Sequence, residues 1–115
     1  MERLVEDQHM NSYMGVDIGT SGCKAVVFDK AGRQVALAYR EYDLISLQPG
    51  QAELDCDEVL EKCFEVMAEA AGSLEPQSVR GLGISCQGEA FAPIDSGGGV
   101  LSNAMVSSDI RAEQY

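Results

Sequence analysis

The chain has 115 residues, of which 45% are hydrophobic and 23% are charged. This length suits one domain with one core, and the composition is typical of a globular protein rather than a disordered one. Eight Lys and Arg residues against 19 Asp and Glu residues give a net charge of −11. So acidic a surface repels nucleic acids and anionic lipids, and we expect neither nucleic acid nor membrane as a partner. A nucleotide is not excluded, because local backbone amides bind phosphate against the overall field.

The start of the chain and the cysteines indicate where the protein resides. Residues 1–12, MERLVEDQHMNS, lack the apolar core of a signal peptide, and we expect a polar, disordered extension. No apolar run reaches the roughly 18 residues that span a bilayer. The four cysteines, at positions 23, 56, 63 and 86, form no Cys-x-x-Cys pair, and the single histidine is His9. This pattern argues against a zinc site and predicts free thiols in a reducing cytoplasm.

The first half of the domain is predicted to be a three-stranded antiparallel meander followed by a helix. The strands are expected over residues 13–18, 23–28 and 34–43, with Gly32 at positive φ in the second turn. After a loop over residues 46–54, Asp55 is a good N-cap, and Glu58 completes a capping box. Apolar residues then recur every three or four positions and are expected in the core: Val59, Leu60, Cys63, Phe64, Met67, Ala70 and Ala71.

The second half predicts a parallel strand that completes a mixed α/β sheet. Strands are expected over residues 79–85, 90–94 and 100–107, and the start of a helix over residues 109–115. In the order β-β-β-α-β the helix is a right-handed crossover, so strand 79–85 should lie parallel to strand 13–18. The C-terminal ends of both strands then share the edge of the sheet at which ligands bind. This arrangement would bring Asp17, Gln87 and Glu89 together.

The segment GVDIGTSGCKAVVFD, residues 15–29, places a small-residue turn between two strands. Glycines allow a ligand to approach the backbone, and the hydroxyls of Thr20 and Ser21 add donors, so the turn suits phosphate. Asp17 at its mouth can hold Mg²⁺ through water, and Lys24 adds positive charge. The alternative is a hairpin with no ligand, in which Asp17 forms the turn and Lys24 is only a solvated side chain.

The same residues resemble a known family. GVDIGTSGCKAVVFD is similar to the first phosphate motif of the actin, Hsp70 and sugar-kinase superfamily. Within it, the chain resembles the FGGY carbohydrate kinases, which include xylulokinase, gluconokinase and glycerol kinase. The resemblance covers about residues 13–115 and also includes PGQAELD at 49–55, GISCQGEAF at 83–91 and SSDIRAE at 107–113.

The resemblance implies a ribonuclease H-like fold and transfer of the γ-phosphoryl group of ATP, with Mg²⁺, to a sugar or polyol hydroxyl. By matching position, Asp17 would be the metal-linked acid, and Gly19, Thr20, Ser21 and Lys24 would contact the nucleotide phosphates. The sugar-contact residues would be Gln87, Glu89 and Asp109. Gly88 and Ser107 depart from the arginine of glycerol kinases and the tryptophan of many members, so neither glycerol nor xylulose is implied.

Several alternatives stay open at this point. Glu89 could be a surface residue, and Asp109 and Arg111 could simply cap a helix and pair with each other. An actin- or Hsp70-like ATPase without a sugar substrate shares the phosphate turn. Because family members are far longer, we expect residues 13–115 to be the N-terminal part of a two-domain enzyme. The catalytic base would lie downstream, so we expect the chain alone to be inactive and its uncovered cleft face to favour a homo-oligomer.

Overall fold

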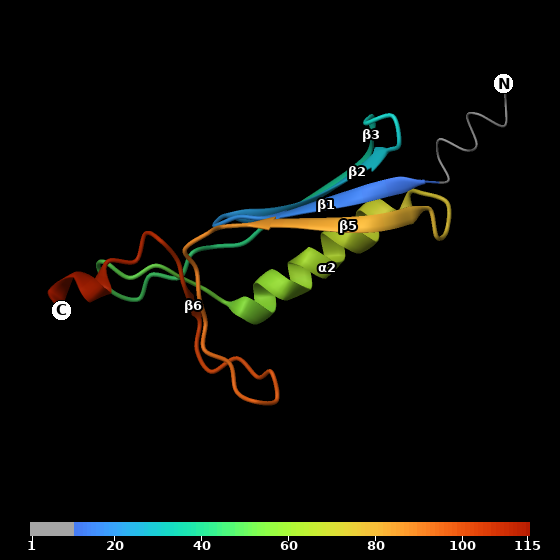
Figure 1. Ribbon diagram of the computed structural model, residues 1–115. Coiled ribbons are helices and arrows are strands. Elements are labelled where there is room, and N and C mark those ends of the chain that lie inside the picture. The colour runs from blue at the N-terminus through green and yellow to red at the C-terminus, as the bar shows by residue number, and fades with distance from the viewer. Residues whose placement is uncertain (1–10) are drawn as a thin grey trace, which may run out of the picture.

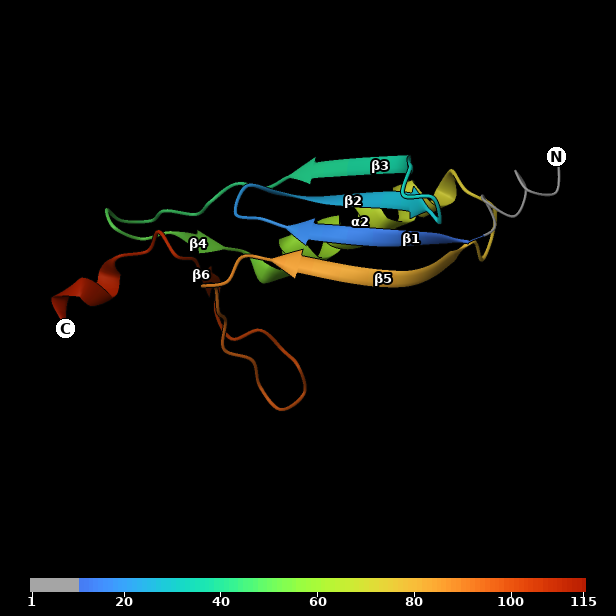
Figure 2. The same cartoon turned by 45° about the horizontal axis from the view of Figure 1, so that its top comes forward.

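The computed structural model describes residues 11–115, which form a mixed four-stranded sheet covered on one face by a helix (Figure 1). The first ten residues of the expected extension lie outside this range. The strands are β1 (Ser12–Ile18), β2 (Gly22–Asp29), β3 (Gln34–Glu41) and β5 (Val79–Cys86). Their order across the sheet is β3-β2-β1-β5, as Figure 2 shows. β1 is antiparallel to β2 and parallel to β5, which confirms the predicted crossover.

Helix α2 (Cys56–Gly72) begins where the sequence predicts. The Asp55 side chain accepts hydrogen bonds from the amides of Asp57 and Glu58, which satisfies two of the unpaired donors of the first turn. Glu58 contacts Lys62, one turn further along the helix, at 3.3 Å. The N-cap is therefore confirmed, whereas the Glu58 carboxylate serves an ion pair along the helix surface.

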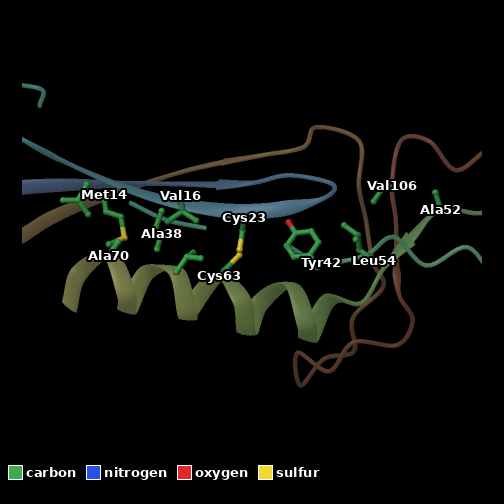
Figure 3. Close-up of a cluster of buried hydrophobic side chains, with 13 residues drawn as sticks. Met14, Val16, Cys23, Ala38, Tyr42, Ala52, Leu54, Cys63, Ala70 and Val106 are labelled. Carbon is green, nitrogen blue, oxygen red and sulfur yellow. The ribbon is translucent and has the colours of Figure 1, made fainter. Parts of the chain in front are cut away.

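The core lies between α2 and the face of the sheet that α2 covers. Alternate residues of β1 and β2 point into it, among them Met14 and Val16 (Figure 3). Val27 and Val66 are completely buried. The expectation that Leu60 and Phe64 are core residues is wrong, because their side chains are 55% and 60% exposed. The buried face of α2 centres on Cys63, Val66 and Ala70, and Phe64 projects beyond it. Spacing of three or four residues predicts an apolar stripe but does not fix which part of it meets the sheet.

Beyond the sheet, residues 43–55 and 87–115 extend together as an arm with little regular structure. It contains two short paired strands, β4 (Glu53–Leu54) and β6 (Ala104–Met105), and the 3-10 helix η1 (Arg111–Gln114). The strands expected over residues 90–94 and 100–107 are wrong, because only β6 and isolated bridges form there. The Asp95 carboxylate accepts hydrogen bonds from the amides of Gly97 and Gly99 and closes the turn between these two segments, which pair only through the bridges Ile94–Val100 and Phe91–Met105.

The arm makes the molecule elongated. Its extents are 65 × 28 × 19 Å and its radius of gyration is 17.8 Å, against about 13 Å for a compact chain of 100 residues. Within residues 11–115, no helix is long and apolar enough to cross a membrane. The sheet face opposite α2 is uncovered and exposes Tyr13, Phe28 and Leu37. The turn between β1 and β2 lies at the end of the sheet from which the arm departs (Figure 2).

Candidate functional site

The C-terminal ends of β1 and β5 meet at one edge of the sheet, as the sequence predicts. Asp17 of β1 lies opposite Ser85 of β5, and Ile18 lies opposite Cys86. The amide of Gln87 continues this pairing and donates to the Ile18 carbonyl at 3.3 Å. The turn of residues 19–22 and the segment after β5 are therefore neighbours, although more than 60 residues separate them in sequence.

The turn of residues 19–22, which we call the phosphate turn, is closed by a hydrogen bond from the Gly19 amide to the Gly22 carbonyl at 2.9 Å. Within residues 11–115, the amides of Thr20 and Ser21 have no recorded hydrogen-bond partner. Those two amides and the side-chain hydroxyls of the same two residues form a set of hydrogen-bond donors that suits an anion.

Gly22 is required by the fold rather than by a ligand. A Cβ atom there would lie 2.6 Å from both the Arg40 carbonyl oxygen and the Tyr39 hydroxyl of β3. At Gly19 the nearest atom to a Cβ would be the Gly22 carbonyl oxygen at 3.3 Å. The glycines thus allow a tight turn and the close approach of β3.

Asp17 and Lys24 are cross-strand neighbours on the uncovered face of the sheet, and both are exposed. They line a shallow hollow with Gly15, Gly83 and Ser85. Nothing lies within 4 Å of a Cβ placed on Gly15 or Gly83, so the absent side chains leave the hollow open. A carboxylate beside an ammonium group and a turn rich in donors fits a phosphate chain with a hydrated Mg²⁺.

The two amino acids after β5 that are candidates for binding a sugar differ in their surroundings. Gln87 directs its Nε2 toward the Gly19 carbonyl at 3.4 Å, and its Oε1 atom is buried without a hydrogen-bond partner in the described part of the chain. Glu89 is exposed in the turn that follows β5. Gln87 is therefore connected to the phosphate turn, while the Glu89 carboxylate is accessible.

Asp109 lies in the arm within a cluster of charged residues. Its carboxylate accepts two hydrogen bonds from Arg111 Nε at 2.9 Å each and one from the Ala52 amide at 2.9 Å. Arg111 also donates to Glu53, which accepts a further hydrogen bond from Asn103. The guanidinium of Arg111 holds the pKa of Asp109 well below its usual range and lowers that of Glu53. Both oxygens of the Asp109 carboxylate thus have hydrogen-bond partners within the arm, and its contact with a substrate stays a prediction.

Tyr42, which no sequence pattern singles out, follows β3 and is 4% exposed. Its hydroxyl oxygen lies 2.5 Å from the Gly19 carbonyl oxygen and 2.9 Å from that of Gly22, and its amide donates to the Ser21 carbonyl at 3.2 Å. Figure 3 shows the ring within the core beside Leu54. In the sequence, Tyr42 is only the end of an alternating strand, and no local signal links it to the turn.

The crossover topology and the turn after β1 together define a ribonuclease H-like domain of the actin, Hsp70 and sugar-kinase superfamily, and solved sugar kinases share this fold. The sequence pattern of the FGGY family of carbohydrate kinases, N-terminal domain, matches residues 12–115. The chain therefore belongs to the FGGY family of carbohydrate kinases.

Individual relatives agree with this assignment. The chain is 37% identical over 105 residues to a probable L-xylulose kinase of Haemophilus influenzae, with 90% of the chain and 22% of the relative covered. It is also 37% identical over 109 residues to a glycerol kinase of Methylobacterium radiotolerans, covering 91% of the chain and 22% of that relative. The crystal structure of a xylulose kinase from Brucella ovis superposes with a TM-score of 0.83 at 28% identity, over 90% of this chain and 22% of that one. The chain thus spans less than a quarter of the length of these relatives.

Proposed function

We propose that this chain is the N-terminal part of an ATP-dependent kinase that transfers the γ-phosphoryl group to a hydroxyl of a sugar or polyol. We refer to the polypeptide of family length that contains it as the full-length enzyme. The observation that supports the proposal most is the meeting of the phosphate turn with the segment after β5 at one sheet edge. Phosphoryl transfer requires donor and acceptor to be held in line, and this edge brings the two binding segments together.

On the phosphate side, Thr20 and Ser21 supply amide and hydroxyl donors, and Lys24 supplies positive charge. Asp17 would hold Mg²⁺ through water, with nucleotide oxygens completing the shell, because in the described range no three His, Cys, Asp or Glu side chains gather as a metal site. When bound, the metal ion neutralises charge that develops on the transferred group. The protein's own part is to orient the phosphates with fixed donors.

On the acceptor side, the exposed carboxylate of Glu89 would accept hydrogen bonds from sugar hydroxyls. Gln87 contributes from the strand end, and Asp109 acts through the order that its cluster gives to the arm. Relatives named as L-xylulose and glycerol kinases differ in their acceptors, and Gly88 and Ser107 depart from family residues. We therefore propose sugars and polyols as a class, and no single member of that class, as the phosphoryl acceptor.

The proposal also includes a cytoplasmic location, where ATP is available. It further includes self-association of the chain through its uncovered sheet face.

The test is an ADP-release assay with the full-length enzyme over a panel of pentoses, hexoses and polyols, with the 115-residue chain assayed in parallel. We expect acceptor-dependent ADP release from the full-length enzyme and background from the chain alone, since the opposite wall of the cleft is missing. ATP hydrolysis that no sugar or polyol accelerates would instead favour an ATPase of the actin or Hsp70 type. Turnover by the 115-residue chain would contradict the assignment of the catalytic base to a downstream segment.

A further inference from the structure

We propose that Tyr42 is a positioning residue that fixes the direction of the free Thr20 amide in the phosphate turn. The inference rests on the proposed function, because it assigns a ligand to that turn. Three contacts carry it: the Tyr42 hydroxyl against the carbonyls of Gly19 and Gly22, and the Tyr42 amide against the carbonyl of Ser21. One residue outside the turn thereby engages three of its four carbonyl oxygens.

Holding a carbonyl inward directs an amide outward. In a planar trans peptide the C=O and N–H groups point in opposite directions. The Gly19 carbonyl points to Tyr42 in the core, so the N–H of the same peptide, that of Thr20, points away from the core. This is one of the two turn amides without a recorded partner in residues 11–115. Tyr42 therefore aims a donor at the place where a phosphate would lie.

The surroundings of Tyr42 suit this role. Burial raises the pKa of its hydroxyl, so the group keeps its proton and acts as a donor throughout the physiological pH range. The single proton is shared between two carbonyls, and each of these has another partner. The Gly22 carbonyl accepts a hydrogen bond from the Gly19 amide, and the Gly19 carbonyl accepts one from Gln87 Nε2 at 3.4 Å. Without the hydroxyl the turn would still close, but only the longer Gln87 contact would hold the carbonyl of the Gly19–Thr20 peptide inward.

The variant Tyr42→Phe separates positioning from packing, because it keeps the buried ring and removes only the hydroxyl. In the full-length enzyme we expect kcat to fall by about tenfold or more, since misdirected donors stabilise the transferred group less well. Affinity for the non-hydrolysable analogue AMP-PNP should fall as well, while affinity for adenosine and for the sugar should change less than about twofold. Tyr13→Phe is the matched control, because it removes a hydroxyl from the other end of the sheet, and it should behave as the unchanged enzyme does.

Binding is measured by isothermal titration and folding by thermal unfolding. Unchanged kcat and AMP-PNP affinity in a folded Tyr42→Phe enzyme would overturn the proposal. Equal losses for AMP-PNP, adenosine and sugar, or failure of the variant to fold, would also overturn it and assign Tyr42 a purely structural role. An unchanged enzyme that binds AMP-PNP but phosphorylates no acceptor would contradict the proposed function, while the comparison of AMP-PNP with adenosine would still test Tyr42.

Discussion

Arg111 and Glu53 are 58 residues apart in the sequence, yet Arg111 Nη2 lies 2.5 Å from a Glu53 carboxylate oxygen. The same nitrogen contacts Asp109, so one guanidinium joins two carboxylates. This contact attaches η1 to β4. The arm is also ordered by the two-residue pairing of β4 with β6 and by the buried side chains of Ala52, Leu54 and Val106.

Replacing Arg111 by Met should therefore destabilise the arm. The change leaves Glu53 and Asp109 half-buried and facing each other without a cation, and uncompensated charges of this kind are costly. We expect the melting temperature of the 115-residue chain to fall by several degrees, as followed by circular dichroism. Arg80→Met is the control, because Arg80 is exposed on β5 and forms no ion pair with any of residues 11–115, and it should melt as the unchanged chain does. Equal melting of both variants would show that the cluster contributes nothing.

Stability should also depend on pH in the acid range. The pKa of Asp109 is lowered by Arg111, and that of Asp29 by hydrogen bonds from Arg33 and Ala31. A carboxyl with a lowered folded-state pKa stabilises the fold above its unfolded pKa, near 4, and this contribution is lost as the pH falls through the folded value. We expect a constant melting temperature between about pH 6 and 8 and a decline below about pH 4.5. The decline should be shallower in Asp109→Asn and unchanged in Asp43→Asn.

Asp17→Asn in the full-length enzyme should lower kcat by about tenfold or more and leave sugar affinity nearly intact. In the proposed function this change removes the charge that would order the Mg²⁺ shell, and a metal ion stabilises charge chiefly as phosphoryl transfer proceeds. Steady-state kinetics at saturating ATP measure kcat, and isothermal titration measures sugar binding. Asp43→Asn, on an exposed residue after β3, serves as control. A mutant with normal kcat and weakened sugar binding would contradict the role of Asp17 at the phosphates.

Glu89→Ala should have the opposite effect. A carboxylate that accepts hydrogen bonds from sugar hydroxyls contributes about 1.5–3 kcal/mol, and a loss of about 2 kcal/mol weakens affinity roughly thirtyfold. AMP-PNP affinity without sugar should barely change, because Glu89 follows β5 and lies outside the phosphate turn. Titration of both ligands into both proteins is the measurement, with Glu113→Ala as control. Unchanged sugar affinity would show that the segment after β5 does not hold the sugar.

The core can be tested by two substitutions in α2. Val66 is completely buried and Phe64 is 60% exposed. Val66→Ala should lower the free energy of unfolding of the 115-residue chain by about 2 kcal/mol through lost burial and a cavity, whereas Phe64→Ala should change it far less. Urea unfolding followed by circular dichroism measures both. A larger loss at Phe64 would mean that self-association covers this side chain in solution.

The sequence was sufficient for the sheet and the crossover helix because their signals are local. Alternation defines β1 to β3, and Asp55 marks the start of α2. The parallel pairing then follows from the handedness of the crossover, which brings Asp17 near Gln87. The Tyr42 contacts and the Arg111–Glu53 pair could not be predicted, since both join residues that are distant in sequence and carry no spacing pattern. The strand expected over residues 90–94 is reduced to isolated bridges at Phe91 and Ile94, and Pro93 between them has no amide to donate to a ladder.

The parallel pairing of β1 with β5 also sets an order of events during synthesis. β1, β2 and β3 are consecutive, so their hairpins can form as soon as residue 41 has emerged from the ribosome. β5 begins only at Val79, and until it arrives one edge of β1 has no partner. The nascent chain therefore passes through a stage in which the strand that carries Asp17 is open to pairing with other chains. Rapid formation of α2, which leads the chain back toward that edge, shortens this stage.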